Sequence, residues 1–271
     1  MKDTLFYIFI FFIVISCTSQ KKNSLEANYH DNPVIAHRGA WKNTGYPQNS
    51  IASLKAAIAL KCHGSEIDVQ LTKEDSLIVF HDIRVRGMAI DSMKYTDLIT
   101  VPLANGERIP TLRDCILEAK KQVGTKLIID IKTPHYTPRA KENAQQVLKL
   151  VKELRAETLV EFLVGDLEAL EYLISETTIP VAYLGRWKNE LPVMYPDSIL
   201  QYGVKYLDYQ DVHYKKHPEW ISKFQEENIH LNAWTINEKE DMIWFIEKNF
   251  DYITTDEPEL LLDIVRERLV N

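Results

Sequence analysis

The chain has 271 residues, of which 45% are hydrophobic, and its formal net charge is −7. This composition is typical of a globular protein and is sufficient for one large domain or two small ones. The mild negative charge and the absence of a stripe rich in lysine and arginine argue against a nucleic-acid-binding protein.

The N-terminal sequence MKDTLFYIFIFFIVIS departs from this composition, because an apolar run extends from Leu5 to Ile15. The run is too short for a comfortable transmembrane helix and has the length of a signal-peptide core. Ser16 then precedes Cys17, and the polar sequence TSQKKNS follows. Residues 1–16 therefore resemble a bacterial lipoprotein signal, in which the cysteine becomes the lipidated N-terminus. An uncleaved anchor or an ordinary signal peptide is the alternative.

The segment after this cysteine is polar and lacks periodicity, so residues 17–32 are predicted to form a tether. Acyl chains anchor a protein stably without spanning the bilayer. We therefore expect an exported lipoprotein, attached by its lipid to a membrane and facing the periplasm or the cell surface.

Short β-prone runs alternate with amphipathic helical patterns from Pro33 onward. The predicted strands are VIAH (34–37), SEIDVQL (65–71), LIVFH (77–81), KLIIDIK (126–132), VEFLV (160–164), PVAYL (180–184), VKYLDY (204–209), HLNAWT (230–235) and DYITT (251–255). The predicted helices include residues 50–62, 111–123, 140–156 and 238–249. Ser50 and Thr111 are the predicted N-caps of the first two.

Apolar strands that alternate with helices favour parallel βαβ units. Eight strands remain if residues 77–81 form a hairpin with residues 65–71, so residues 33–271 are predicted to form a (β/α)₈ TIM barrel. The rival is an open doubly wound sheet, but the first strand is followed by HRGAWKNTG, which lacks the G-x-G-x-x-G pattern. Residues 83–110 are mostly polar and indicate a small insertion after the second barrel strand, over the barrel mouth.

Two further cysteines, Cys62 and Cys115, lie in helical patterns. In an exported protein they could form a disulfide. We favour two buried free thiols.

Polar residues cluster at the predicted C-terminal ends of the barrel strands, where barrel enzymes carry their active residues. Glu66 and Asp68 stand two positions apart in one strand and share a face, as do Asp130 and Lys132 in another. Three carboxylates facing the interior would be costly to bury without a cation. They predict a site for Ca²⁺ or Mg²⁺, which prefer oxygen ligands. The alternative is that these acids point outward to lysines on the helices.

Two histidines flank these acids in the predicted barrel. His37 closes the first strand and His81 closes the run after the second. Imidazoles titrate near neutral pH, so the two predict a general acid and a general base, although a histidine at a strand end is often structural. Arg38 offers a planar fork suited to phosphate.

The motifs that carry these residues resemble, in order and spacing, the motif series of glycerophosphodiester phosphodiesterases. They are HRG (37–39), EID (66–68), HD (81–82), DIK (130–132), AWTIN (233–237) and ITTDEP (253–258). The resemblance extends from about Val34 to the C-terminal helix. It implies a (β/α)₈ barrel with a small insertion after the second strand, in agreement with the element pattern.

The resemblance also implies the chemical roles at the site. His37 and His81 would be the acid–base pair, and Glu66 and Asp68 would bind the metal. Asp130 stands where the family usually carries a glutamate as the third metal ligand.

The same resemblance assigns substrate contacts. Arg38 and Lys132 would hold the phosphate, and Trp234 would line the pocket near the glycerol. Supporting positions are Gln48, Asn49 and Asp82.

Two positions depart from the family pattern. The family's P-E-N-[TS] is PQNS (47–50) here, so Gln48 replaces an acid, and Asp130 is shorter than glutamate by one methylene. Gln48 can hydrogen-bond but cannot act as a base. These departures bear on which metal binds and how tightly.

The implied reaction is metal-dependent hydrolysis of glycerophosphodiesters, the deacylated phospholipid head groups, to glycerol 3-phosphate and an alcohol. One alternative is a phospholipase D-like or phosphoinositide-cleaving enzyme that acts on intact lipid, which would need an exposed apolar rim. A non-catalytic binding barrel is the other. The two departures favour it mildly, and the retention of both histidines argues against it.

Overall fold

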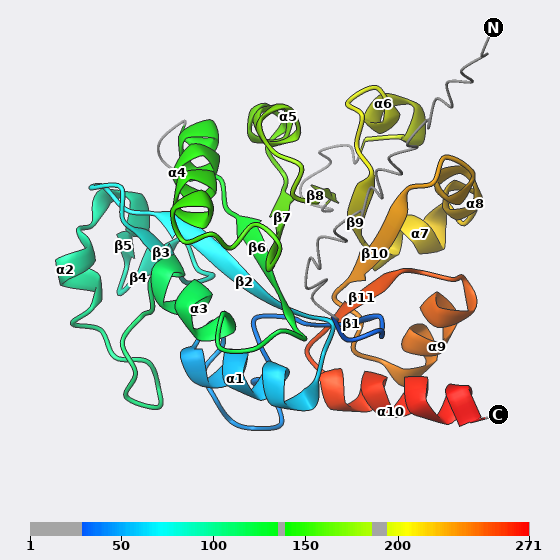
Figure 1. The fold of residues 1–271 in the computed structure, drawn as a ribbon, viewed down its shortest axis with the longest axis horizontal. Coiled ribbons are helices and arrows are strands. Elements are labelled where there is room, and N and C mark those ends of the chain that lie inside the picture. Colours follow the sequence, from blue (N-terminus) through cyan, green and yellow to red (C-terminus); the bar gives the residue numbers. More distant parts are fainter. Residues whose placement is uncertain (1–28, 135–138, 186–193, 271) are drawn as a thin grey trace, which may run out of the picture.

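Eight parallel strands close into a barrel in the computed structural model, which describes residues 29–134, 139–185 and 194–270. The first strand pairs with both the second and the last, so the ring is complete (Figure 1). The barrel strands are β1 (Val34–Ala36), β2 (Gly64–Leu71), β6 (Lys126–Ile131), β7 (Val160–Val164), β8 (Val181–Gly185), β9 (Tyr206–Gln210), β10 (His230–Trp234) and β11 (Tyr252–Thr255). This closure confirms the predicted TIM barrel and excludes an open doubly wound sheet.

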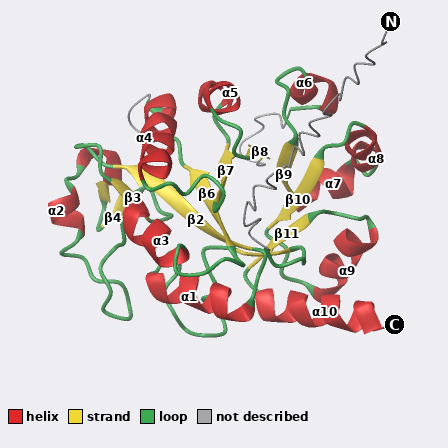
Figure 2. Cartoon of the chain, viewed as in Figure 1, coloured by secondary structure: helices red, strands yellow, loops and turns green. Residues whose placement is uncertain are grey.

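Helices surround the sheet on its outer side (Figure 2). They are α1 (Ile51–Leu60), α3 (Leu112–Ala119), α4 (Ala140–Glu153), α5 (Leu167–Glu176), α6 (Pro196–Leu200), α7 (Asp211–Lys216), α8 (Glu219–Glu226), α9 (Lys239–Glu247) and α10 (Pro258–Val270). Capping boxes begin α1 and α3, because the Ser50 and Thr111 side chains each accept a hydrogen bond from the backbone N–H three residues later. Both predicted N-caps are confirmed.

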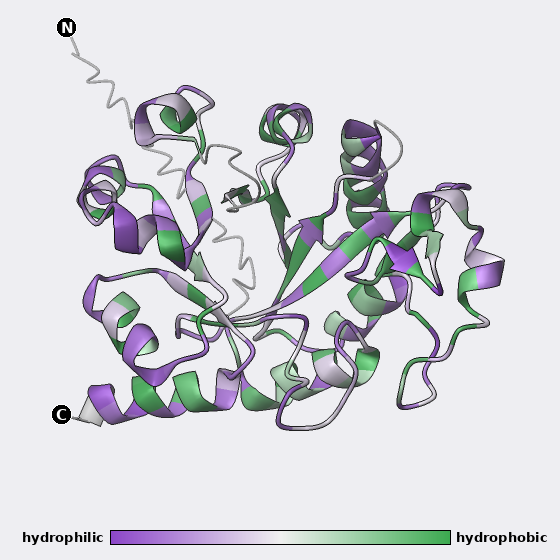
Figure 3. Cartoon of the chain, turned by 180° about the vertical axis from the view of Figure 1, so that it is seen from behind, coloured by the Kyte–Doolittle hydropathy of each residue, from purple (hydrophilic) through white to green (hydrophobic). Residues whose placement is uncertain are grey.

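Successive side chains of each strand point to opposite sides of the barrel wall. Polar and apolar residues of one strand can therefore face different surroundings. Ile67 and Val69 belong to the main core, which lies between the sheet and the helices. Glu66 and Asp68 occupy the other face of the same strand, and Figure 3 shows apolar and polar bands alternating along β2. A smaller apolar cluster inside the barrel consists of Ile35, Ile128, Leu163 and Leu184.

The insertion follows the hairpin partner of β2, which is β3 (Leu77–Val79), antiparallel to it as predicted. Its elements are β4 (Arg84–Val85), β5 (Met88–Ala89), the 3₁₀ helix η1 (Ile90–Ser92) and α2 (Tyr95–Leu98). The sequence pattern suggested a mostly polar segment. The structure instead shows that the insertion encloses a small core of its own, formed by Ile78, Val85, Ile90, Met93, Leu98 and Ile109. These side chains pack against one another, and none of them lines the pocket at the C-terminal ends of the barrel strands.

The first described residues, which the sequence places in the tether, pack on the end of the barrel where the strands begin. The Tyr29 hydroxyl donates a hydrogen bond to the Thr158 carbonyl, and the Lys126 ammonium lies 4.0 Å from the centre of the Tyr29 ring. The His30 backbone N–H donates to the Gly124 carbonyl at 2.8 Å. Because these partners lie at or just before the starts of β6 and β7, the chain enters the barrel at its base.

Cys62 and Cys115 are both free and buried, which confirms the preference for thiols over a disulfide. Burial raises the pKa of the Cys62 thiol to about 12, so it is a poor nucleophile. Within the described residues, no helix has the length and apolar content required to cross a membrane. The predicted signal and Cys17 lie outside the described residues.

Candidate active site

A pocket of about 60 Å³ opens among the C-terminal ends of the barrel strands. It brings together side chains that are far apart in the sequence, because parallel strands all end at the same side of a barrel. Seven of the predicted site residues line it: His37, Arg38, Glu66, His81, Asp130, Lys132 and Trp234.

Three carboxylates come together beside this pocket. Asp68 on β2 stands directly opposite Asp130 on β6 in the strand register, and Glu66 lies two residues earlier on β2. One oxygen from each of the three lies within 4.8 Å of the others, and all three residues are buried. One Asp130 oxygen, Oδ1, has no hydrogen-bond partner. The acids thus face inward, and their hard oxygen atoms suit a divalent cation.

Two basic residues partly neutralise the carboxylates. Lys132 Nζ lies 2.6 Å from Asp68 Oδ1 and also pairs with Asp130. Arg38 Nε lies 3.3 Å from Asp68 Oδ2, an ion pair without hydrogen-bond geometry. Both basic side chains are therefore next to the acids, where an incoming phosphate could exchange for a carboxylate partner.

Burial and the neighbouring charges shift the pKa values of Glu66 and Asp68 in opposite directions. Burial, and then the charges of Asp68 and Asp130, raise the pKa of Glu66 well above its ordinary value. Burial would also raise the pKa of Asp68, but Lys132 and Arg38 lower it below its ordinary value. Without a metal ion, Glu66 therefore binds a proton more readily than Asp68 does.

The loop between β1 and α1 holds the arginine and one of the acids in place. Gln48 Oε1 accepts a hydrogen bond from Arg38 Nη1 at 2.7 Å, so an amide is a sufficient acceptor at this position. The Asn49 side chain donates to Asp68 Oδ2 at 2.7 Å and accepts from the Asp68 backbone N–H at 3.0 Å. Asn49 has φ +58°, a left-handed conformation that asparagine tolerates well.

His37 is held by residues that the sequence analysis did not assign. Its Nδ1 lies 2.7 Å from Asp256 Oδ1, just after β11. The Asn237 side chain donates to the other Asp256 oxygen at 3.0 Å and accepts from the Asp256 backbone N–H at 2.9 Å. Burial lowers the pKa of His37, and the Asp256 carboxylate opposes this effect. An Nδ1–H that donates to Asp256 leaves Nε2 free to accept a proton.

His81 has a more open environment. Its Nδ1 lies 2.9 Å from Asp82 Oδ1, and the side chains are 41% and 72% exposed. The two histidines thus have similar carboxylate partners, but only the His37 pair is enclosed and fixed by a third residue. This asymmetry favours different roles for the two imidazoles.

One more acid lines the pocket that the sequence analysis did not single out. Asp208 on β9 is 2% exposed, and burial followed by the nearby Asp130 raises its pKa well above its ordinary value. The Trp234 indole N–H donates to the Asp208 backbone carbonyl at 3.2 Å, which fixes the ring beside this residue. An aspartate inside the apolar run VKYLDY was the available sign of an interior polar position.

The fold and this pocket define a (β/α)₈-barrel hydrolase with paired histidines and a carboxylate triad that could hold a metal ion. The model of the glycerophosphoryl diester phosphodiesterase family matches residues 37–260, and the chain belongs to this family. Its members are typically metal-dependent phosphodiester hydrolases.

Individual relatives agree with this membership. The chain is 28% identical over 253 residues to a glycerophosphodiester phosphodiesterase from Caldanaerobacter subterraneus, covering 86% of this chain and 97% of the relative. A crystal structure of a glycerophosphodiester phosphodiesterase from Parabacteroides distasonis is 32% identical, with a TM-score of 0.82 over 89% of this chain and all of that one. The fold is also similar to an Oleispira antarctica phosphodiesterase in complex with the product sn-glycerol-3-phosphate, at 21% identity and a TM-score of 0.75, covering 87% and 97% of the two chains.

The Asp256→Asn change should lower kcat by about 10- to 100-fold, the usual cost of removing a carboxylate that orients a functional histidine. Loss of the negative charge should lower the pKa of His37 further. If His37 is the base, the acidic limb of the kcat/KM profile then moves to lower pH. Asp82→Asn is the matched control. It removes the carboxylate beside the exposed His81 and should leave the acidic limb where it is in the wild type. An acidic limb that does not move in Asp256→Asn would show that His37 is not the titrating base.

Proposed function

We propose that the protein hydrolyses glycerophosphodiesters to glycerol 3-phosphate and an alcohol, with Ca²⁺ or Mg²⁺ as its cofactor. The observation that carries this proposal is the convergence of four side chains on one pocket, namely His37, His81, Glu66 and Asp130. Asp68 completes the carboxylate triad beside them. The product complex of the Oleispira relative supports glycerol 3-phosphate as the released phosphate ester.

The triad of Glu66, Asp68 and Asp130 would hold the cation. Their buried oxygens and the unpartnered Asp130 Oδ1 fit such a ligand. A divalent cation bound there would offset the negative charge of the phosphate.

The remaining steps belong to side chains of the chain itself. Arg38 and Lys132 would bind the phosphate oxygens. His37 Nε2 would take a proton from the attacking water as the water oxygen forms the new bond to phosphorus. His81 would give a proton to the alcohol oxygen as the old P–O bond breaks. His37 then releases its proton to solvent and His81 takes one up from solvent, so both return to their starting states.

A substrate panel tests this proposal. The full-length protein would be assayed on glycerophosphocholine, glycerophosphoethanolamine and intact phosphatidylcholine, each with Ca²⁺, Mg²⁺ or excess EDTA. We expect glycerol 3-phosphate from the first two substrates only, and only with a metal ion. Preferential cleavage of intact lipid would favour the lipase-type alternative, and binding without turnover would favour the non-catalytic barrel.

We also propose that Cys17 is lipidated and holds the protein on a membrane, on the basis of the apolar run and the Ser16–Cys17 junction. The Cys17→Ser change should abolish incorporation of labelled fatty acid and leave an unprocessed or mislocalised precursor. Metabolic labelling in the native host, followed by membrane fractionation, measures both effects. The control is Cys62→Ser, because Cys62 is buried in the barrel domain. Unchanged labelling of Cys17→Ser would refute this assignment.

A further inference from the structure

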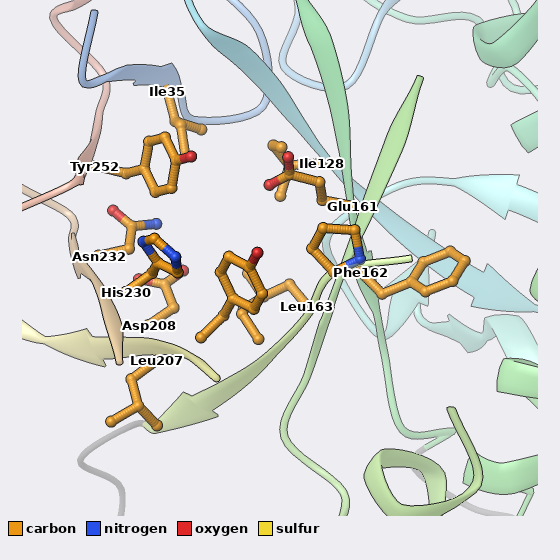
Figure 4. Close-up of a pocket in the computed structure, with 13 residues that line it drawn as sticks. Ile35, Ile128, Glu161, Phe162, Leu163, Leu207, Asp208, His230, Asn232 and Tyr252 are labelled. Atoms are coloured by element: carbon orange, nitrogen blue, oxygen red, sulfur yellow. The ribbon is translucent and has the colours of Figure 1, made fainter. Parts of the chain in front are cut away.

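Asp208 forms part of the pocket floor, yet no step of the proposed reaction uses it. In the strand register it stands opposite Leu184 on β8 and Asn232 on β10. It lines the active-site pocket and also a second cavity of about 30 Å³ on the basal side. Figure 4 shows this second cavity, with Asp208 and Asn232 beside it. Asp208 therefore lies at the partition between the two spaces.

The surroundings of this carboxyl group leave one oxygen unused. Leu163, Leu184 and the partly buried Trp234 belong to the apolar cluster inside the barrel. The Asn232 side chain lies on the neighbouring strand, but its amide donates to Thr254 Oγ1 at 2.9 Å. Asp208 Oδ1 has no hydrogen-bond partner, although the residue is only 2% exposed. Buried polar atoms in proteins are nearly always paired, so an unpaired oxygen at the floor of a substrate pocket points to a partner supplied by the ligand.

We propose that Asp208 recognises the terminal hydroxyl of the glycerol half of the substrate, the hydroxyl farthest from the phosphorus. This inference rests on the proposed function. An uncharged hydroxyl suits the site, because it can donate to Asp208 Oδ1 while the carbon chain contacts the apolar wall and Trp234. A phosphate does not suit this position, because an anion would lie beside a carboxyl group. The phosphate has basic partners elsewhere in the pocket, where Arg38 and Lys132 line the wall.

Selectivity follows from this arrangement. A site built to pair with a hydroxyl rejects an analogue that lacks it, because a buried polar atom is then left unpaired. The enzyme should therefore cleave glycerol diesters with a higher kcat/KM than diesters of alcohols that lack the terminal hydroxyl, although the reacting phosphate is the same in both.

The test compares two substrates in the full-length, metal-loaded enzyme. One is sn-glycero-3-phosphocholine. The other is the matching 1,2-propanediol phosphocholine, which keeps the hydroxyl beside the phosphate-bearing carbon and loses only the terminal one. We expect the wild-type kcat/KM to favour the glycerol substrate by about 10²-fold or more. Asp208→Leu should bring this ratio close to one, and Asp208→Asn should keep part of it because an amide still hydrogen-bonds.

The control is Glu161→Gln, since Glu161 lines only the basal cavity of the two and its change should leave the ratio intact. An unchanged ratio in Asp208→Leu, with both substrates cleaved, overturns the inference and leaves the proposed function standing. That result would mean that Asp208 Oδ1 pairs with a buried water, for which the 30 Å³ cavity has room. If Asp208→Leu does not fold, an unchanged ratio in Asp208→Asn together with a wild-type ratio near one has the same meaning. No cleavage of either substrate by the wild type overturns both proposals.

Discussion

Alanine at either histidine should reduce kcat by at least about 10²-fold, the usual contribution of a general acid or base. His37 and His81 reach the same pocket from the ends of β1 and β3, so they can act on opposite sides of one phosphate. Because they serve one reaction, the double variant should lose far less than the product of the two single losses. Steady-state kinetics on glycerophosphocholine measures all three variants.

A substrate with a nitrophenol leaving group separates the two roles. This group departs without a proton, so it should rescue the variant that lacks the acid and not the variant that lacks the base. The enclosed His37–Asp256 pair suits the base, and the exposed His81 suits the acid, so rescue is expected in His81→Ala. Equal rescue of both variants, or of neither, would refute separate roles. His217→Ala is the control, since His217 stacks on Trp220 outside the pocket.

Removal of the metal ion, or of one of its ligands, should abolish activity. Asp68→Ala deletes a carboxylate that contacts Lys132 and Asn49, and excess EDTA should have the same effect on the intact triad. A ligand at 100 times its Kd stabilises a protein by about 2.7 kcal/mol, so saturating metal should raise Tm by roughly 5 to 10 °C for a domain of this size. Activity assays and thermal scans with and without Ca²⁺ or Mg²⁺ measure both effects.

Metal affinity should also depend on pH. The raised pKa of Glu66 means that metal must displace a proton from this acid, so metal affinity should fall as the pH is lowered. The control is Asp263→Ala, because Asp263 is an exposed acid on α10. Full activity in excess EDTA, or a metal-dependent Tm shift that survives in Asp68→Ala, would remove the triad from the mechanism.

The fold could be predicted because each barrel strand combines a β-prone run with a following helix, and every predicted strand lies within two residues of an observed one. The site could be predicted where polar residues interrupt apolar strands, as Glu66 and Asp68 do in β2. Register then placed Asp68 opposite Asp130, a pairing that depends on the sheet and not on either strand alone.

Other features depend on contacts that spacing does not show. Asp256 meets His37 only because β11 closes the ring against β1, across most of the chain. Asp208 interrupts an apolar run, but β9 carries no second acid two positions away, as β2 does, so this interruption alone did not identify a site. The core of the insertion escaped notice because its apolar residues are spread over several short elements, without a helical or strand period.

The contacts of Tyr29 and His30 at the barrel base have a consequence for how the enzyme would sit on a membrane. With lipid on Cys17, as proposed, twelve residue steps would separate the bilayer from Tyr29, and a chain of this length spans at most about 40 Å. The pole of the barrel nearest the lipid would then be the one opposite the catalytic pocket. The pocket would open toward the aqueous compartment. There it would meet dissolved glycerophosphodiesters released by lipases, and not the acyl chains of the membrane to which the protein is anchored.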